Sequence, residues 1–250
     1  MHPILFHWHF LTIRSYGVCM ALAFAAGIAL AAWLNRKDGR QDDAVLDLAV
    51  WLMVGSVIGA RVLYVIVQPQ EFAARPWEVF FIWQGGLVYY GGLVGGALAG
   101  AWWIRGQKLP LWPMADCLAP AIALGQAIGR QGCFLNGCCY GVVNFKYGVI
   151  FPAIGDNLPH LPTEQYESFA CLALAAFLVW FKLRRRSFEG QVFWIYVLSY
   201  SVIRFVIEFW RGDVARGTLI SPLLSPSQWI SLVTFSLGLW FLWKLGKKAS

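Results

Sequence analysis

The chain has 250 residues, of which 59% are hydrophobic and 13% are charged. A soluble domain carries about 25% charged and about 45–50% apolar residues, so this composition excludes disorder and argues against a soluble enzyme. The 20 Lys and Arg residues exceed the 13 Asp and Glu residues, giving a net charge of +7. In a membrane protein such an excess first reflects topology, and we expect no nucleic-acid partner.

Apolar runs that are long enough to cross a bilayer, which takes about 20 residues each, recur along the chain. We therefore predict an all-α, polytopic membrane protein with about seven transmembrane helices, built as a single transmembrane domain over residues 1–250. The predicted helices cover residues 18–34, 45–67, 87–104, 111–128, 167–181, 192–209 and 229–245.

Two stretches differ from ordinary membrane spans. Residues 1–15 alternate aromatic, aliphatic and His side chains, which favours an extended or interfacial arm with aromatic anchors. Residues 129–162 are rich in Gly and Pro, and we expect them to fold onto the outer face as a small periplasmic head or lid.

The basic residues predict the orientation of the chain. If the N-terminus lies outside, every second connection is cytoplasmic, and these connections hold 12 of the 20 basic residues. They are Arg36, Lys37, Arg40, Arg105, Lys108, Lys182, Arg184, Arg185, Arg186, Lys244, Lys247 and Lys248. This distribution predicts an N-out, C-in topology. The remaining basic residues need another explanation, and they are where we look for function.

Ionisable residues inside a span cost at least ~2.5–3.5 kcal/mol on insertion scales. Arg61 lies in the second predicted helix, Arg130 follows the fourth, and Arg204 and Glu208 share one face of the sixth. Ion pairs that only join helices are one interpretation. The other is an anion site, because Arg61, Arg130, Arg204 and Arg211 share one sign and a guanidinium matches phosphate oxygens. In a membrane, the abundant phosphate belongs to phospholipid headgroups.

Glycines recur four residues apart, as at Gly55 and Gly59 and at Gly91 and Gly95. This spacing lets helix backbones approach closely in lipid. Plain helix packing is one interpretation. In the other, the Gly pairs at 85–86 and 91–92 flank a break in the helix that faces a cavity.

Three of the six cysteines lie in apolar runs and are expected to behave as small buried hydrophobes: Cys19, Cys117 and Cys171. The others, Cys133, Cys138 and Cys139, form a Cys-x4-Cys-Cys pattern on the outer side. A disulfide is favoured in an oxidising compartment, with packed free thiols, a metal site and a redox-active pair as alternatives. Because the histidines lack the spacing of metal ligands, we assign no metal.

One segment carries a known signature. Residues 129–141 read Gly-Arg-Gln-Gly-Cys-Phe-Leu-Asn-Gly-Cys-Cys-Tyr-Gly. This run resembles the signature Gly-Arg-x-Gly-Asn-Phe-x-Asn-Gly-Glu-x-x-Gly of the bacterial prolipoprotein diacylglyceryl transferase family.

Further blocks agree with this family in order. Residues 14–17, Arg-Ser-Tyr-Gly, are similar to its Arg-x-Tyr-Gly. Residues 85–93, Gly-Gly-Leu-Val-Tyr-Tyr-Gly-Gly-Leu, are similar to Gly-Gly-x-x-x-His-Gly-Gly-Leu. Residues 200–211, Tyr-Ser-Val-Ile-Arg-Phe-Val-Ile-Glu-Phe-Trp-Arg, are similar to Tyr-Gly-x-x-Arg-Phe-x-x-Glu-x-x-Arg. Residues 162–167, Pro-Thr-Glu-Gln-Tyr-Glu, resemble His-Pro-x-Gln-x-Tyr-Glu with one residue fewer between Gln and Tyr.

The resemblance implies a multi-pass transferase of the bacterial inner membrane. It would move diacylglyceryl from phosphatidylglycerol to the lipobox cysteine thiol of a prelipoprotein, releasing glycerol-1-phosphate without a cofactor. Charge moves onto the phosphate as it leaves, and prepositioned donors stabilise that charge by several kcal/mol. The residues implied as catalytic are Arg130, Arg204, Tyr90 and Glu208. Those implied as substrate-binding are Tyr16, Arg61, Asn136, Gly141, Glu167, Tyr200 and Arg211.

Three positions depart from the family pattern, because its His falls at Tyr90, its signature Asn at Cys133 and its signature Glu at Cys138. A phenol with a pKa of about 10 is a poor general base at neutral pH, although it still donates a hydrogen bond. Two alternatives therefore stay open. One is a related lipid-dependent transferase with another acceptor, and the other is a non-catalytic anionic-lipid-binding protein or transporter.

Overall fold

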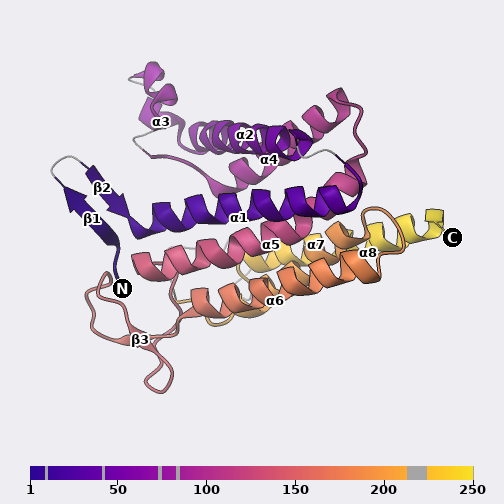
Figure 1. Ribbon diagram of the computed structural model, residues 1–250. Helices are drawn as coiled ribbons and strands as arrows, with labels where there is room; N and C mark the ends of the chain where they lie inside the picture. Colours follow the sequence, from indigo (N-terminus) through magenta and orange to yellow (C-terminus); the bar gives the residue numbers. More distant parts are fainter. Residues whose placement is uncertain (9–10, 41–42, 73–74, 83–84, 213–223, 250) are drawn as a thin grey trace. The chain divides into compact units, whose positions relative to one another are not determined.

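The computed structural model describes residues 1–8, 11–40, 43–72, 75–82, 85–212 and 224–249 (Figure 1). Within these ranges six helices are long and apolar enough to cross a membrane, and the chain is an all-α, multi-pass membrane protein, as predicted. These helices are α1 (Ser15–Lys37), α2 (Asp43–Val67), α5 (Leu111–Asn136), α6 (Thr163–Arg184), α7 (Gln191–Glu208) and α8 (Pro226–Ala249).

The third predicted span corresponds to α4 (Tyr89–Gly106), a helix of 18 residues that is not one of these six. Six of its residues are glycines, which add length to the helix but little hydropathy. The prediction of about seven spans therefore includes one helix whose hydropathy is below that required of a membrane span.

The chain divides into two compact units. Unit 1 comprises Met1–Ala31 and Ala115–Ser250, and unit 2 comprises Ala32–Met114. The single transmembrane domain expected from the sequence stays a prediction, and each unit is described by itself below.

Unit 2 contains α2, the short helix α3 (Pro69–Phe72), the 3-10 helix η1 (Pro76–Phe80) and α4. Its centre is a close antiparallel contact between α2 and α4. A Cβ atom at Gly59 would clash with the carbonyl oxygen of Gly91, and one at Gly55 would clash with Ala99 and the backbone of Gly95. The glycine spacing thus serves helix packing, because side chains here would force the two backbones apart.

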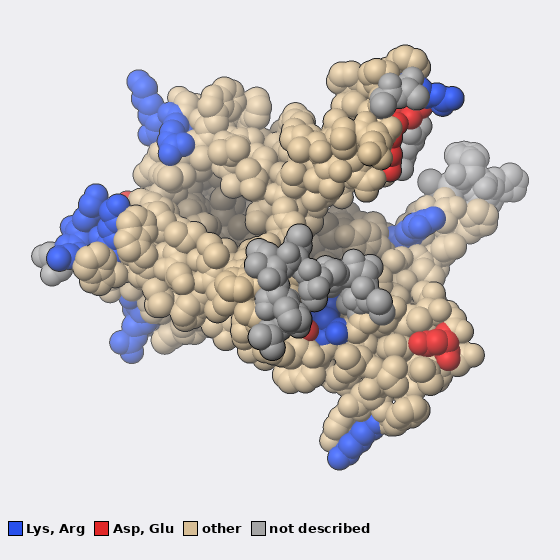
Figure 2. All heavy atoms as spheres, turned by 180° about the vertical axis from the view of Figure 1, so that it is seen from behind, with Lys and Arg blue, Asp and Glu red and all other residues tan. Residues whose placement is uncertain are grey.

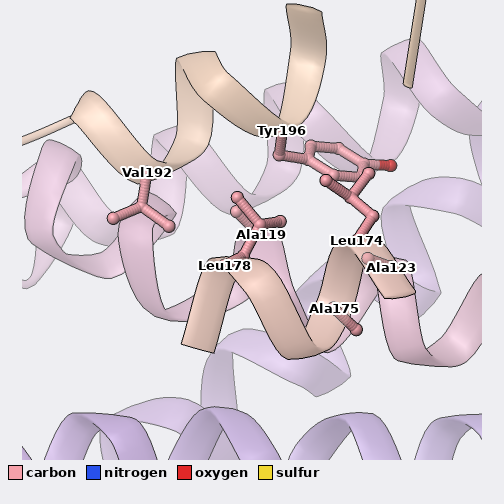
Figure 3. Close-up of a cluster of buried hydrophobic side chains, with 7 residues drawn as sticks. All are labelled: Ala119, Ala123, Leu174, Ala175, Leu178, Val192 and Tyr196. Atoms are coloured by element: carbon pink, nitrogen blue, oxygen red, sulfur yellow. The ribbon is translucent and has the colours of Figure 1, made fainter. Parts of the chain in front are cut away.

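The core of unit 1 lies where α5, α6 and α7 pack together (Figure 3). Helix α5 contributes two alanines, which let the larger side chains of α6 and α7 approach its backbone. The buried cluster consists of Ala119, Ala123, Leu174, Ala175, Leu178, Val192 and Tyr196. The three helices therefore pack around one buried apolar cluster.

A buried carboxylate fixes the first turn of α7 against α5. Asp116 is fully buried, and it accepts hydrogen bonds from the backbone N–H groups of Gly190 at 2.8 Å and Phe193 at 2.9 Å. Arg186 lies 3.9 Å from the same carboxylate. Since the first N–H groups of a helix have no partner inside it, this side chain satisfies donors that burial would otherwise leave unpaired.

The N-terminal arm is a β-hairpin of β1 (Ile4–Trp8) and β2 (Leu11–Arg14), so it is extended, as predicted. The backbone N–H of Ser15 donates to the carbonyl of Pro3 at 3.1 Å and ties the start of α1 to this hairpin. The arm therefore continues directly into the first span.

The predicted head at residues 129–162 begins too early, because α5 continues to Asn136. The glycines that suggested a loop serve packing instead: a Cβ at Gly132 would crowd Cys19 and Tyr16 of α1. Helix α5 ends where Gly137 adopts a φ of +75°. The head therefore covers residues 137–162, with β3 (Val149–Ile150) pairing β4 (Pro159–His160).

The head is tied to the end of α7. The backbone N–H of Val142 donates to the carbonyl of Trp210 at 2.9 Å, and Gly141 forms a β-bridge with Arg211. Within the head, the N–H of Leu158 and the ring of His160 both donate to Asp156 and hold the pKa of that carboxyl below its ordinary value. These bonds fix the segment that follows the family signature.

The distribution of charge on unit 1 agrees with the expected topology. Helices α6 and α8 end at the same side of this unit (Figure 1), and both carry basic residues in their last turns. Figure 2 shows a largely uncharged surface, and large apolar side chains such as Phe169 and Trp240 are exposed on the helices. Such a surface suits contact with lipid. The N-out orientation itself stays a prediction.

We predict that Gly59→Val destabilises the protein, because the new side chain overlaps the backbone of α4. Overpacking of this kind costs about 1–3 kcal/mol, to be measured as a lower midpoint of unfolding in detergent. The matched control is Gly106→Ala at the end of α4, where a Cβ atom meets nothing within 4 Å. Equal stability of the two variants would contradict the close contact.

Candidate active site

Arg130, Glu167 and Tyr200 come together from three helices, α5, α6 and α7, and form the Arg130 group. Arg130 Nη2 lies 2.9 Å from Glu167 Oε1, and the Tyr200 hydroxyl donates to the same oxygen at 3.0 Å. The side chain of Glu167 is 1% exposed and that of Arg130 is 22% exposed. The carboxylate therefore lies beneath the guanidinium and pairs with it, while the part of Glu167 in substrate binding stays a prediction.

One turn beyond Tyr200 on α7 lies the Arg204 group, which comprises Arg204, Glu208, Ser225 and Ser227. The predicted pair of Arg204 and Glu208 is present at 2.6 Å, and Ser225 donates to Glu208 at 2.9 Å. Arg204 Nη2 donates to Ser227 at 3.3 Å, whereas its buried Nη1 has no hydrogen-bond acceptor among the described residues. An unpaired buried donor is costly and marks a place for an acceptor.

Residues four apart on a helix are separated by about 6 Å along its axis. Tyr200 and Arg204 have this spacing, so the Arg130 group and the Arg204 group lie one turn apart along α7. Both groups lie toward the outer end expected for this helix, beyond the buried core cluster. The structure thus combines two anchored arginines within unit 1.

Cys133, Cys138 and Cys139 form a thiol cluster, in which all three Sγ atoms lie within 4.8 Å of one another. The end of α5 explains their approach. The N–H of Cys138 donates to the carbonyl of Cys133 at 3.1 Å, and that of Gly137 donates to Phe134 at 3.1 Å. These two bonds and the left-handed Gly137 define a Schellman motif, which brings the side chains at Cys133 and Cys138 together.

Cys139 also has a positive φ, +71°, which turns its thiol toward the other two. Hydrogen bonds from Cys133 and Cys138, together with the positive charges of Arg211 and Arg130, lower the pKa of Cys139 from its ordinary value. All six cysteines are free thiols. The positive charges of Arg130 and Arg211 therefore act on this cluster.

The remaining unit 1 residues implied as substrate-binding surround this cluster. Tyr16 interacts electrostatically with the three thiols and with Arg130, and the Asn136 side chain is hydrogen-bonded to Cys138. The positive charge of Arg211 interacts with Cys139. Gly141 has a structural role, since its N–H donates to the carbonyl of Leu161 at 2.7 Å and its own carbonyl lies 2.9 Å from His160 Nδ1.

Arg61 and Tyr90 belong to unit 2. Arg61 is buried and donates to the carbonyls of Glu78 at 2.6 Å, Val79 at 2.8 Å and Gly85 at 2.8 Å. These bonds fix the segment before α4, so Arg61 positions backbone; its role in substrate binding stays a prediction. Tyr90 lies exposed in the first turn of α4, and its proposed catalytic role is likewise untested.

Comparison with known proteins identifies the family. The sequence profile of the prolipoprotein diacylglyceryl transferase family matches residues 3–244. The chain belongs to the prolipoprotein diacylglyceryl transferase family. This confirms the resemblance seen in the sequence.

Several relatives carry the name phosphatidylglycerol–prolipoprotein diacylglyceryl transferase. One from Clostridium tetani is 36% identical over 243 residues, covering 96% of each chain. One from Synechococcus elongatus is 35% identical, covering 96% of this chain and 86% of the relative. One from Geobacter sulfurreducens is 32% identical, covering 95% and 92%. The similarity to this transferase family therefore extends over nearly the whole length.

Glu164 is a candidate functional residue that the sequence analysis did not assign. It is fully buried in the first turn of α6, and neither carboxylate oxygen has a hydrogen-bond partner in the described part of the chain. It interacts electrostatically with Cys139, Arg211 and Arg130. The sequence contains a signal for Glu164. If Tyr166 and Glu167 are aligned with the Tyr-Glu of the family pattern, the Gln of that pattern falls at Glu164, and residues 162–167 match the pattern without a gap.

A pocket of about 390 Å³ lies between the head and the beginning of α6. Its lining is mostly apolar and consists of Asn144, Tyr147, Leu161, Tyr166 and Trp210. Trp210 follows the Arg204 group on the chain, and Tyr166 precedes Glu167.

We predict that Glu167→Ala lowers the free energy of unfolding by about 3 kcal/mol, because it leaves Arg130 with no carboxylate beneath it. Denaturant unfolding in detergent measures this loss. Glu167→Gln keeps the shape and the bond to Tyr200, so its stability should be intermediate. Glu189→Ala, at an exposed position, is the control. A Glu167→Ala variant as stable as this control would rule out the buried pair as a stabilising element.

Proposed function

We propose that this chain transfers the diacylglyceryl group of phosphatidylglycerol to the lipobox cysteine thiol of a prolipoprotein. The observation that carries the proposal is the pair of arginines anchored by buried carboxylates, Arg130 on Glu167 and Arg204 on Glu208. Family membership and the names of the relatives agree with it. We place the protein in the bacterial inner membrane, with the arginine groups toward the outer leaflet.

The two arginines suit a lipid phosphate for electrostatic reasons. The positive charge of each arginine is paired with a carboxylate. This pairing lowers the free-energy cost of placing the charge in the low-dielectric interior of the helix bundle. Arg204 Nη1 has no acceptor among the described residues, so a phosphate oxygen would satisfy it. A bidentate contact between guanidinium and phosphate then fixes the headgroup in one orientation.

The reaction moves negative charge from sulfur to phosphate. The acceptor thiolate attacks the sp3 carbon that carries the phosphate ester, the S–C bond forms, and the C–O bond breaks. The electron pair of that bond leaves with the phosphate oxygen, giving a thioether and glycerol-1-phosphate. Arg130 and Arg204 stabilise the growing charge on the leaving group, and Tyr200 and Glu167 keep Arg130 in place.

The direct test uses the full chain in nanodiscs containing phosphatidylglycerol, with a lipobox peptide as acceptor and release of glycerol phosphate as the readout. We expect Arg130→Ala and Arg204→Ala each to lower the turnover rate by about 100-fold or more, as for the loss of one transition-state donor. Arg184→Ala, an exposed basic residue at the far end of α6, is the matched control and should retain full turnover.

The possible outcomes separate the proposal from its alternatives. If phosphatidylglycerol binds but no glycerol phosphate is released by the wild type, the protein is a lipid-binding protein. If glycerol phosphate is released while the peptide stays unmodified, the acceptor is a different one, and mass spectrometry of the products identifies its class. Unchanged turnover in both arginine variants would contradict the assigned site.

A further inference from the structure

The thiol cluster has the geometry of a metal site with three sulfur ligands. Zinc–thiolate bonds are about 2.3 Å long, so three sulfurs in a tetrahedral arrangement lie ~3.8 Å apart. In the structure the three Sγ atoms all lie within 4.8 Å of one another. Shifts of about 1 Å or less would therefore bring them to bonding distance.

The backbone holds the three sulfurs in this arrangement. Cys133 and Cys138 are joined by the Schellman motif at the end of α5, and Cys139 follows in a left-handed conformation. A left-handed conformation is unfavourable for an L-residue, and such strain is concentrated at functional sites. The cluster is half-buried, so an ion and a small exposed group can reach it.

We propose that Cys133, Cys138 and Cys139 bind a zinc ion whose fourth position takes the acceptor thiol. This inference rests on the proposed function, because it assigns the group that activates the thiol. Catalytic zinc sites have three protein ligands and one open position, and a thiol bound to zinc is deprotonated outright. From the sequence alone we assign no metal and favour a disulfide. A disulfide joins only two thiols, however, and here three thiols lie next to one another.

A zinc site would also replace the proton-accepting side chains that this chain lacks relative to the family pattern. The family's His falls at the phenol of Tyr90, and its signature Asn and Glu fall at Cys133 and Cys138. The chain thus loses an imidazole and a carboxylate that are able to accept a proton, and it gains two thiols beside a third. A metal-bound thiolate supplies a nucleophile at neutral pH without a general base.

The surroundings suit the net charge of such a site. A zinc ion with three thiolates carries a charge of −1, and the positive charge of Arg130 acts on Cys133 and Cys139 while that of Arg211 acts on Cys139. Arg130 is also the residue assigned to the lipid phosphate. The acceptor sulfur on zinc and the leaving phosphate on Arg130 are therefore neighbours, as displacement at the carbon between them requires.

The step balances without an oxidant or reductant. The acceptor thiol binds zinc through sulfur and releases its proton to water. A sulfur electron pair then forms the S–C bond, and the pair of the broken C–O bond leaves with the phosphate. The product thioether is neutral and binds zinc more weakly than a thiolate, which frees the fourth position for the next acceptor.

The test begins with metal binding by the full chain in detergent, independent of transfer. We expect about one zinc ion per chain by elemental analysis, and a thiolate-to-metal absorption band after exchange to Co²⁺. Cys133→Ser, Cys138→Ser and Cys139→Ser should each weaken binding at least about tenfold. Cys19→Ser, half-buried and outside the cluster, is the matched control and should bind normally.

A second measurement adds a lipobox peptide to the Co²⁺ protein. The peptide with Cys should change the cobalt spectrum, whereas the peptide with Ser should not. Removing zinc with a chelator should abolish glycerol phosphate release, and adding zinc back should restore it. Transfer that continues at full rate in protein without metal, or a reduced cluster that binds no zinc, overturns the metal site and leaves the proposed function intact.

The remaining outcomes are also decisive. If zinc binds but the Cys peptide leaves the cobalt spectrum unchanged, the open fourth position is wrong. If mass spectrometry finds two of the three cysteines joined as a disulfide in active protein, the cluster is a staple and the metal site is overturned. If the metal and peptide results hold but phosphatidylglycerol is never consumed, the proposed function fails and the metal site stands.

Discussion

The buried carboxylate of Glu167 beneath Arg130 is the interaction on which the rest of the site depends. A lone charge in the bilayer interior is expensive, and pairing it with an opposite charge lowers that cost. Glu167 comes from α6, Arg130 from α5 and Tyr200 from α7, so this single contact also joins three helices.

The helix arrangement of unit 1 makes this contact possible. Alanines on α5 let α6 and α7 pack closely, and the Asp116 carboxylate fixes the first turn of α7 at the other end. From that layer Tyr200 and Arg204 extend along one helix in successive turns. Packing of the three helices thus fixes where Tyr200 and Arg204 lie on α7.

Much of this arrangement is predictable from the sequence, because its signals are local. Hydropathy predicts the spans, and the four-residue spacing of Arg204 and Glu208 predicts their pair, which the structure contains. The same reasoning ends α5 too early, because residues 129–162 as a whole are rich in Gly and Pro. Gly132 faces α1, and this long-range contact is not visible in local sequence.

The contacts across helices are what the sequence does not provide. Arg130 and Glu167 are 37 residues apart, and nothing local indicates that one pairs with the other. The unpartnered carboxylate of Glu164 and the close approach of three thiols likewise depend on how α5, α6 and the head meet. Arg61, with its bonds to backbone carbonyls, shows that an intramembrane arginine also serves structure.

The central claim is that Arg130 and Arg204 together hold the phosphate of one anionic lipid. An electron cryomicroscopy structure of the full chain in nanodiscs containing phosphatidylglycerol tests it most directly. The account predicts headgroup density in which phosphate oxygens lie about 3 Å from both guanidinium groups. A phosphatidylglycerol phosphate bound elsewhere, with both arginines contacting only their carboxylate partners, would contradict it.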